Sequence, residues 1–480
     1  MAAHEAGALH APDYGGVASV PSWLRPPGDV NDLLPALWPV TTQRGDAGVL
    51  TVGGLDVGAL AERFGTPAYV LDEADFRSRA TAFRDAFAAA FAGLGGGDVY
   101  YASKAFTCTA VARWIAEDGL GLDVCSGGEL AVGLRGGVPA ARMTLHGNNK
   151  ADAELRRALE AGIGRIAVDG LDEIDRIADA AAQLGVRARV LLRVTVGVEA
   201  HTHEYMSTAH EDQKFGLSLA DGVAADAIRR VLARPELELL GLHSHIGSQI
   251  FDTGGFEVAI RRLLGLHART ASGEVTGGTG YVMPELDLGG GYGIAYTSAH
   301  DPLEPKTLAD QMADIVAREC RGLQIDVPRV SVEPGRAIAG PSTFTLYRVG
   351  AVKDVRLDSG ASRRYIAVDG GMSDNIRTAL YGADYSCALA SRESDAAPVL
   401  SRVVGRHCES GDIVVRDEFL PVDVGRGDLL AVPGTGAYCR SMASQYNHVP
   451  RPPVVAVRDG EARVLVRRET EDDLLALDVG

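Results

Sequence analysis

The chain has 480 residues, of which 46% are hydrophobic and 23% charged, the balance of a globular protein with a substantial core. Its 47 basic and 64 acidic side chains give a formal net charge of −17. This charge argues against nucleic acid or an anionic membrane as a partner, because binding to either needs a basic face. No run approaches about 18 consecutive apolar residues, so a membrane span is not expected.

The start of the chain and its cysteines indicate the compartment. Residues 1–14 lack a basic segment followed by an apolar one, so a signal peptide is not expected. The six cysteines, at positions 108, 125, 320, 387, 408 and 439, are scattered without CxxC spacing. They predict reduced thiols, and neither disulfides nor a zinc site. We therefore expect a cytoplasmic protein without a metal.

Eight short apolar or β-branched runs follow one another in the first two thirds of the chain and predict strands. They lie at residues 99–103, 120–126, 143–148, 165–170, 190–196, 239–247, 285–291 and 330–336. Between them, apolar side chains recur every three to four positions, which predicts helices such as 151–162, 171–185, 223–235 and 307–320, with another at 76–93. This alternation predicts a parallel α/β fold, a (β/α)8 barrel of the TIM type. A doubly wound sheet is the alternative.

The chain beyond residue 340 predicts a second, all-β domain, a β-barrel or sandwich. Short strands at 343–352, 364–371, 402–407, 428–434, 453–460 and 462–468 are separated by Gly, Asp and Pro turns. The segment 48–71 also reads as strand and is expected to complete that domain. The predicted division is a flexible lead-in (1–32), an N-terminal segment joining the β-domain (33–73), the barrel (74–340) and the β-domain (341–480).

Polar residues gather where the predicted barrel strands end. In chain order they are Lys104, Asp123, His146, Asp169, Arg193, His245, the run Gly289, Gly290 and Gly291, and finally Glu333 and Arg336. The active site of a (β/α)8 barrel is built at that face, from the ends of several strands. Any one of these residues, taken alone, more often caps a helix or forms a structural ion pair. Such structural roles do not explain why the whole set occurs together at the strand ends.

The chemistry of this set points to pyridoxal phosphate. Lys104 lies in an apolar frame, which lowers the pKa of an amine and suits Schiff-base formation. The glycine-rich strand end exposes backbone N–H groups to a phosphate, and an imidazole such as His245 can stack on a flat ring. A carboxylate such as Glu333 can hold a pyridine nitrogen protonated, so that the ring accepts electrons.

The motifs identify the chain as similar to the fold-type III pyridoxal-phosphate decarboxylases, the family of the ornithine and arginine decarboxylases. The resemblance is strongest to the diaminopimelate decarboxylase branch. It rests on YYASKAF (100–106), LDVCSGGEL (122–130), HGNNK (146–150), HTHEYMSTAHEDQKFG (201–216), HSHIGSQI (243–250), LDLGGGYG (286–293), EPGRA (333–337), DGGMSDNIR (369–377), CESGD (408–412) and GAYC (436–439). The last three segments favour diaminopimelate over ornithine or arginine.

The resemblance implies a role for each matching residue. Lys104 would hold the cofactor covalently, His245 would stack on its ring, and Glu333 would bind its pyridine nitrogen. The phosphate would be held by Ser248, Gly290, Gly291, Gly335, Arg336 and Tyr438. The substrate residues would be Arg336, Arg377, Tyr381, Glu409 and Tyr438, with Cys408 placed to protonate the carbanion. Cys408 and Glu409 would come from the partner subunit, which implies a homodimer with a shared active site.

The resemblance implies decarboxylation of meso-2,6-diaminopimelate to L-lysine and carbon dioxide, the last step of lysine biosynthesis. This specificity has a physical logic, because Arg377 can bind the distal carboxylate in a bidentate manner while Glu409 pairs with the distal ammonium. Two alternatives stay open. One is a related decarboxylase acting on arginine, ornithine or carboxynorspermidine, and the other is a non-catalytic protein that binds pyridoxal phosphate on the same fold.

Two histidine clusters suggest a metal and are interpreted otherwise. His201, His203 and His210 form an HxH…H pattern, but no carboxylate or Cys completes a convincing ligand set. His243 and His245 would share a face if both lay in a strand, yet the cofactor role of His245 explains more. No metal is therefore expected at either cluster.

Overall fold

The computed structural model describes residues 20–46, 48–198, 214–356 and 362–480. Its chain forms two compact units. The barrel unit comprises Arg77–Gly293 and Pro302–Ala337, and the β-unit comprises Met1–Phe76, Ile294–Asp301 and Ile338–Gly480. No helix among the described residues combines the length and apolar character that crossing a bilayer requires.

The barrel unit contains a closed ring of eight parallel strands. They are β5 (Gly97–Ala102), β6 (Gly121–Val124), β7 (Met143–Leu145), β8 (Arg165–Val168), β9 (Ala188–Thr195), β11 (Leu237–His243), β12 (Glu285–Asp287) and β13 (Arg329–Val332). Pairing runs in chain order, and β13 pairs with β5 to close the ring. The two-residue strand β10 (Leu217–Ser218) adds to β9 outside the ring. All eight predicted barrel strands are thus found in the predicted order, and the barrel is confirmed.

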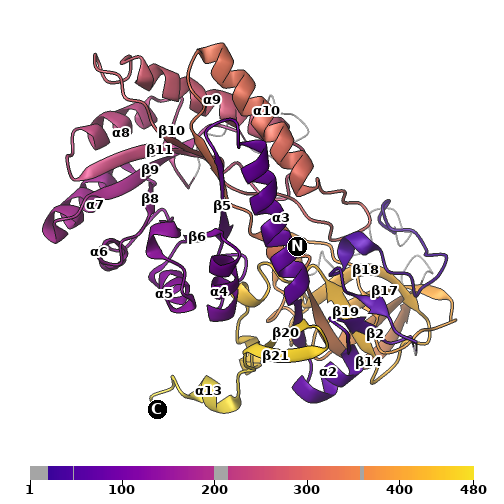
Figure 1. Cartoon of the computed structure of the whole chain (residues 1–480). Coiled ribbons are helices and arrows are strands. Elements are labelled where there is room, and N and C mark those ends of the chain that lie inside the picture. The colour runs from indigo at the N-terminus through magenta and orange to yellow at the C-terminus, as the bar shows by residue number, and fades with distance from the viewer. Residues whose placement is uncertain (1–19, 47, 199–213, 357–361) are drawn as a thin grey trace, which may run out of the picture. The chain divides into compact units, whose positions relative to one another are not determined.

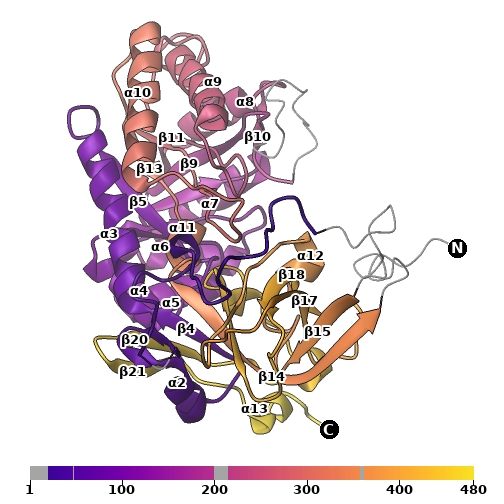
Figure 2. The ribbon, with the colours of Figure 1, turned by 90° about the vertical axis from the view of Figure 1, so that its right-hand side faces the viewer.

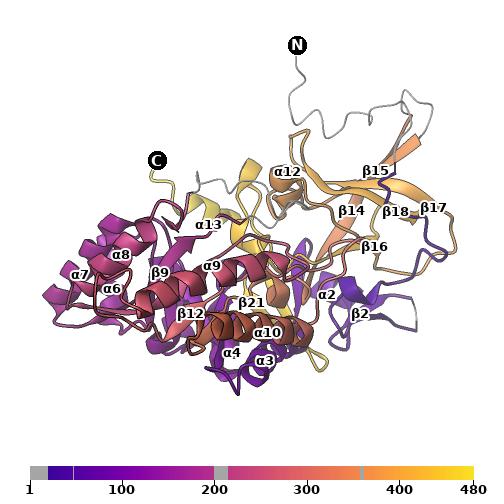
Figure 3. The same cartoon turned by 90° about the horizontal axis from the view of Figure 1, so that it is seen from above.

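Helices lie on the outer side of the ring (Figures 1 and 3). They are α3 (Glu73–Ala90), α4 (Thr109–Glu117), α5 (Gly127–Gly136), α6 (Asp152–Glu160), α7 (Leu171–Leu184), α8 (Val223–Leu232), α9 (Gly254–Ala271) and α10 (Pro305–Leu323). The short helix α11 (Arg336–Ala339) follows β13. The helix α7 shows why these segments are helical. Ile174, Ile177 and Ala181 recur at helical spacing and are fully buried, and the helix stops at Gly185, whose φ of +66° is left-handed.

Arg165 is a buried cation that lies among acidic side chains inside the barrel. Arg165 on β8 pairs with Glu285 (3.0 Å) and Asp287 (3.1 Å) on β12, and its guanidinium lies 4.0 Å from the ring centroid of Tyr100 on β5. Arg165 and these partners lie on three strands of the ring, so the cluster ties the strands together through the inside. The periodicity of the sequence gave no indication of this cluster.

The β-unit contains a mixed sheet built from both ends of the chain. Its strands are β4 (Ala68–Asp72), β14 (Thr343–Arg356), β15 (Ser362–Val368), β16 (Ala388–Leu389), β17 (Pro398–Val404), β18 (Ile413–Pro421), β19 (Leu429–Pro433), β20 (Val454–Arg458) and β21 (Glu461–Val466). The longest of them, β14, pairs with β15 (Figure 2). The N-terminal strand β4 lies between β14 and β20, antiparallel to the first and parallel to the second. The prediction that an N-terminal segment completes this sheet is confirmed.

Smaller elements complete the β-unit. A three-stranded sheet is formed by β1 (Gln43–Arg44), β2 (Leu50–Val52) and β3 (Leu55–Asp56), and the helices are α2 (Val57–Phe64), α12 (Arg377–Tyr381) and α13 (Glu471–Leu475). The expectation of strand throughout 48–71 is wrong for α2. Asp56 caps this helix by accepting a hydrogen bond from the Ala59 N–H at 2.9 Å, and Val57, Leu60 and Ala61 form its buried face.

Candidate active site

The carboxyl ends of the ring strands bring the predicted polar residues to one mouth of the barrel. Lys104 follows β5, Asp123 lies in β6, His146 follows β7, and Glu333 follows β13. Because the strands are parallel, their carboxyl ends meet at the same end of the barrel. The structure therefore gathers residues that are up to 229 positions apart in the sequence (333 − 104).

The amine-bearing side chain of Lys104 is exposed, although both residues on either side of it are buried. Burial raises the pKa of Asp123 to about 6, and the positive charge of Lys104 opposes this shift. The same charge acts together with burial to lower the pKa of His245. The backbone is fixed just before it, because the N–H of Ser103 donates to the carbonyl of Asp123 at 3.0 Å. The site thus presents an accessible amine on a rigid strand end.

The imidazole of His245 is held in one tautomer. Its Nδ1 accepts a hydrogen bond from the Gly290 N–H at 3.2 Å, so a neutral ring carries its proton on Nε2. Burial lowers the pKa of His245 well below its usual value, and the positive charges of Lys104 and Arg193 act in the same direction. A neutral, flat imidazole at this position is suited to lie against a heteroaromatic ring.

The glycine-rich segment after β12 allows three close backbone approaches. A Cβ on Gly289 would lie 2.6 Å from the Ser244 carbonyl oxygen, one on Gly290 would lie 2.2 Å from that of Glu333, and one on Gly291 would lie 2.4 Å from that of Gly247. Gly289 and Gly291 also have φ values of +66° and +108°, which favour glycine. Hydrogen bonds from the Glu333 N–H to the Gly289 carbonyl (2.8 Å) and from the Ile250 N–H to the Gly291 carbonyl (3.0 Å) fix the segment.

Arg336 and Ser248 form a polar pair beside this segment. Arg336 Nη2 donates to Ser248 Oγ at 2.8 Å. The adjacent Gly335 is tightly packed, because a Cβ there would lie 2.9 Å from the Cβ of Ala102. A guanidinium and a hydroxyl that already meet are a suitable arrangement for binding a small anion such as a phosphate.

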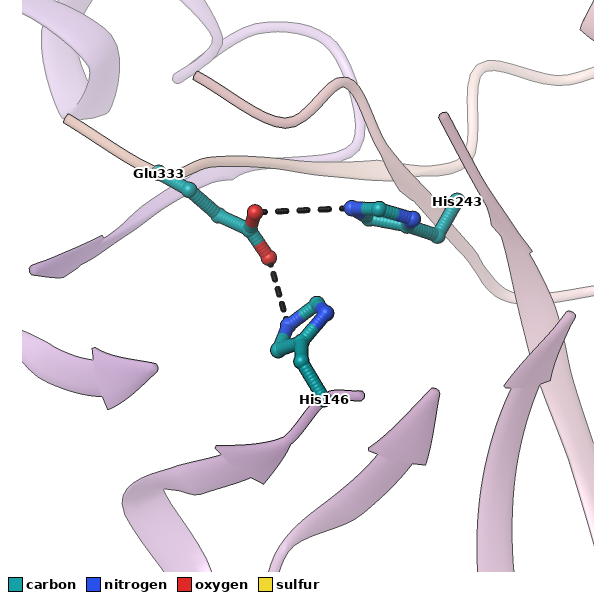
Figure 4. Close-up of side chains that lie close together, drawn as sticks. All are labelled: His146, His243 and Glu333. Atoms are coloured by element: carbon teal, nitrogen blue, oxygen red, sulfur yellow. Dashed lines mark hydrogen bonds and ion pairs between the residues drawn. The ribbon is translucent and has the colours of Figure 1, made fainter. Parts of the chain in front are cut away.

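Glu333 lies between two histidines (Figure 4). Its Oε1 forms an ion pair with His146 Nε2 at 2.8 Å, and its Oε2 lies 3.4 Å from His243 Nε2. Asp123 Oδ1 is 3.7 Å from the same His146 nitrogen. Burial raises the pKa of the Glu333 carboxyl, but the two histidines outweigh it and the net pKa lies well below the usual value. Glu333 is therefore an ionised carboxylate out of contact with water.

A cavity of about 390 Å³ opens beside His245 in the barrel unit. Its lining includes Arg193, Lys214 and Phe215, and both cations lie over the Phe215 ring, at 4.5 and 4.8 Å from its centroid. Arg193 Nε is also 3.8 Å from Asp169 Oδ1, so two of the predicted strand-end residues pair with each other. His201, His203 and His210 lie outside the described residues.

The remaining predicted site residues belong to the β-unit. Arg377, the first residue of α12, is buried, donates to the Tyr385 hydroxyl at 2.5 Å and stacks over the Tyr296 ring at 4.7 Å. Tyr381, at the end of the same helix, is 62% exposed. Tyr438 has a φ of +61° and is partly buried.

Cys408 and Glu409 lie in the turn between β17 and β18. The Cys408 side chain is exposed, and its backbone N–H donates to Asn447 Oδ1 at 3.2 Å. Asp412, which ends the same motif, accepts from the N–H groups of Met372 (2.6 Å) and His407 (2.7 Å). This carboxylate ties the CESGD motif to the DGGMSDNIR motif.

Sequence reasoning missed two groups of residues around these sites. His243 was considered only as a metal ligand, although its i, i+2 spacing from His245 marked it as a residue near the mouth. Tyr296 and Tyr385, which surround the Arg377 guanidinium, carried no motif signal. Both groups depend on contacts between segments that are distant in the sequence.

The match to known proteins covers nearly the whole chain. Residues 73–340 match the family model described as pyridoxal-dependent decarboxylase, pyridoxal binding domain. Over 453 residues, covering 94% of this chain and 100% of the relative, the chain is 54% identical to the diaminopimelate decarboxylase of Mycobacterium tuberculosis. The chain belongs to the diaminopimelate decarboxylase family.

Two further family members extend the comparison. The diaminopimelate decarboxylase of Bacillus subtilis is 45% identical over 439 residues, which is 92% of this chain and 97% of the relative. The crystal structure of the diaminopimelate decarboxylase of M. jannaschii, in complex with L-lysine, superposes with a TM-score of 0.85 at 31% identity. That match covers 92% of this chain and 99% of the other, so the fold of the family is conserved across both units.

The barrel mouth of this family member fits its cofactor, pyridoxal phosphate. The mouth offers an exposed amine for the aldehyde of the cofactor and a neutral imidazole for the face of its ring. It also offers a buried carboxylate for the ring nitrogen. The Arg336–Ser248 pair and the glycine-rich segment supply cationic and hydrogen-bonding groups for a phosphate. Each part of the cofactor therefore has a chemically suitable group at the barrel mouth.

Proposed function

We propose that this chain decarboxylates meso-2,6-diaminopimelate to L-lysine and carbon dioxide, the last step of lysine biosynthesis. The observation that carries the proposal is the constellation of Lys104, His245, Glu333 and Arg336 at one barrel mouth, in a chain that matches diaminopimelate decarboxylases over their full length. When bound, pyridoxal phosphate supplies an electron sink for the bond that the departing carbon dioxide leaves behind.

The barrel residues bind and orient the cofactor. Lys104 would hold it covalently through its amine, and the neutral imidazole of His245 would pack against its ring. Glu333, kept ionised by its two histidines, would accept a hydrogen bond from the protonated ring nitrogen. Ser248, Gly290, Gly291, Gly335 and Arg336, together with Tyr438, would hold the phosphate.

The β-unit residues recognise the far end of the substrate. Arg377 binds the distal carboxylate and Glu409 pairs with the distal ammonium, with Arg336, Tyr381 and Tyr438 as further contacts. Tyr296 and Tyr385 support the Arg377 guanidinium from one face and one edge, which limits its rotation. Cys408 delivers the proton that replaces the carboxylate, and its exposed side chain is accessible for this role.

Substrate preference tests the proposed reaction. Purified protein loaded with pyridoxal phosphate should absorb in the visible range and release carbon dioxide from meso-diaminopimelate, with ornithine and arginine as controls. Lys104→Ala should lose both the absorbance band and the activity. Faster turnover of ornithine or arginine would assign the chain to a related decarboxylase, and a bound cofactor without any turnover would indicate a non-catalytic protein.

We further propose that the active form is a homodimer in which Cys408 and Glu409 act in the partner's site. Mixing inactive Lys104→Ala and Cys408→Ala proteins, with exchange of subunits, should then restore about a quarter of the wild-type activity. Half of the dimers become mixed, and each mixed dimer holds one intact site of two. Absence of any recovery after verified exchange would show that each chain holds a self-contained site.

A further inference from the structure

Four ionisable side chains from four strand ends meet at the base of the proposed cofactor site. They are Asp123, His146, His243 and Glu333. The side chains of all four are at most 8% exposed, so none is solvated by bulk water. The proposed function uses only Glu333, and the other three have no role in it.

A carboxylate at this depth needs an explanation. Removing an ionised carboxyl group from water favours its protonated form, and a protonated Glu333 could not accept a hydrogen bond on both oxygens. The structure places an imidazole nitrogen at each oxygen, with His146 at 2.8 Å and His243 at 3.4 Å. Each oxygen has two lone pairs, so each retains a second acceptor site for another donor.

The two histidines differ in charge. His146 faces two carboxylates, Asp123 and Glu333, which outweigh the effect of burial and raise its pKa. Burial lowers the pKa of His243, and the single carboxylate of Glu333 does not reverse that shift. His146 is therefore the cation of the group, and His243 is a neutral N–H donor.

The remaining charged neighbours do not alter this distribution. Asp287 on β12 adds a negative charge that favours protonation of both histidines. Burial raises the pKa of Asp123 to about 6, against the positive charges of His146 and Lys104, so this carboxyl is ionised at pH 7.5. Lys104 and Arg193 both act on His245. With Asp123 and Glu333 ionised and His146 protonated, the four-residue group carries a net charge of −1. This charge complements a protonated pyridine nitrogen.

We propose that His146 and His243 are positioning residues for the cofactor, which hold Glu333 ionised and aligned to receive the ring nitrogen. The inference rests on the proposed binding of pyridoxal phosphate at this mouth. It concerns the ground-state binding of the cofactor and not the identity of the substrate. Its test can therefore be made without any turnover.

The same three ligand atoms, on His146, His243 and Glu333, lie within 4.8 Å of one another, which also suits a metal ion. The 2.8 Å separation of His146 Nε2 from Glu333 Oε1 is that of a close ion pair, in which a protonated His146 supplies the positive charge beside the carboxylate. The ion-paired arrangement is therefore preferred, and the metal becomes an outcome of the test.

The dissociation constant of pyridoxal phosphate from the apoprotein, measured against pH, tests the proposal. His146→Gln keeps an N–H donor near the position of Nε2 but removes the charge. The ratio of the variant's constant to that of the wild type cancels the ionisation of the cofactor itself. We expect this ratio to be about tenfold or more near pH 6 and to approach one near pH 8.5, where Glu333 ionises without help.

His267→Gln is the matched control. His267 on α9 is also buried, and burial alone lowers its pKa, so its replacement removes a buried imidazole away from Glu333. This variant should bind the cofactor with a ratio close to one at every pH. A His146→Gln ratio that stays within twofold across the range, or that follows the control, would overturn the proposal.

Nitrogen-15 NMR of the histidine side chains in the wild-type apoprotein gives a second test, which reports the protonation state of His146 directly. A doubly protonated imidazole is expected at pH 7.5, assigned to His146 by its absence from His146→Gln. A neutral His146 at that pH would contradict the inference. So would one equivalent of tightly bound zinc that is lost in both His146→Gln and His243→Gln. If the cofactor binds as expected but diaminopimelate is not turned over, the proposed reaction fails while this inference stands.

Discussion

At the scale of single residues, Glu418 on β18 shows how burial sets the pH dependence of stability. Its carboxyl oxygens accept from the N–H groups of Phe419 (2.9 Å) and Cys387 (3.4 Å). Burial raises the pKa of Glu418 from its ordinary value to about 7, which these hydrogen bonds only partly offset. The folded state thus binds this proton more tightly than the unfolded state does. Ionising Glu418 therefore lowers the free energy of unfolding. This penalty is absent below about pH 4.5 and grows as the pH rises to about 7.

Glu418→Gln should remove most of this pH-dependent penalty. We expect the variant to gain Tm relative to the wild type between about pH 5 and pH 8, by a few degrees at the upper end, because each pKa unit corresponds to about 1.4 kcal/mol. Calorimetry across this pH range measures the gain. A Tm difference that does not change with pH would contradict the assignment.

Glu469 provides a control because its pKa shift, and therefore its effect on the pH dependence of stability, has the opposite sign. Burial raises its pKa, but the N–H and guanidinium of Arg451 outweigh that effect, and the net pKa is lowered. Its contribution to stability is present above the unfolded pKa and is lost as the pH falls. Glu469→Gln should therefore lower the Tm most at high pH.

At the scale of elements, the glycine-rich segment after β12 makes a sharp prediction. Gly290→Ala would place a methyl group 2.2 Å from the backbone oxygen of Glu333, which cannot move without distorting β13. We expect a loss of roughly 2 kcal/mol or more in the free energy of unfolding, together with weaker binding of pyridoxal phosphate. Urea unfolding and a cofactor titration measure the two effects.

Gly265→Ala is the matched substitution in open space. Gly265 lies within α9, and no atom outside its own helix turn lies within 4 Å of an added Cβ. Alanine should stabilise this helix by about 0.5–1 kcal/mol and leave cofactor binding unchanged. Equal losses in both glycine variants would show that the segment after β12 has no special constraint.

Some elements of the fold could be predicted from the sequence, and others could not. The barrel strands could be predicted because strand and helix alternate locally and each carries its own apolar period. The location of Lys104, His146 and Glu333 at one mouth of the barrel followed from that prediction, because the carboxyl ends of parallel strands lie at the same end of a barrel. The helix α2 was missed because its eight residues are flanked closely by strands on both sides. The pairing of His146 and His243 with Glu333 depends on side-chain geometry, and no periodicity encodes it.

At the scale of the whole molecule, the strand β4 joins distant parts of the chain. Its five residues are all buried, and Val70 is only 1% exposed between β14 and β20. Val70→Asp would bury an unpaired charge and should cost more than about 4 kcal/mol, enough to prevent the β-unit from folding. Val464→Asp on β21 is the control, because Val464 is 46% exposed and its change should stay near 0.5 kcal/mol. Soluble yield and circular dichroism distinguish the two.

The position of β4 has a consequence for the synthesis of the chain. Leu71 pairs with Thr343, which the ribosome adds 272 residues later (343 − 71), and with Ala456, 385 residues later (456 − 71). At about 5–20 residues per second, β4 waits roughly 15–50 seconds for its first neighbour. The ring of the barrel can close as soon as Val332 emerges, before either partner of β4 has emerged. During this interval an apolar strand with two unpaired edges is open to wrong partners, so protein production should depend on temperature and chaperones at this step more than on the barrel.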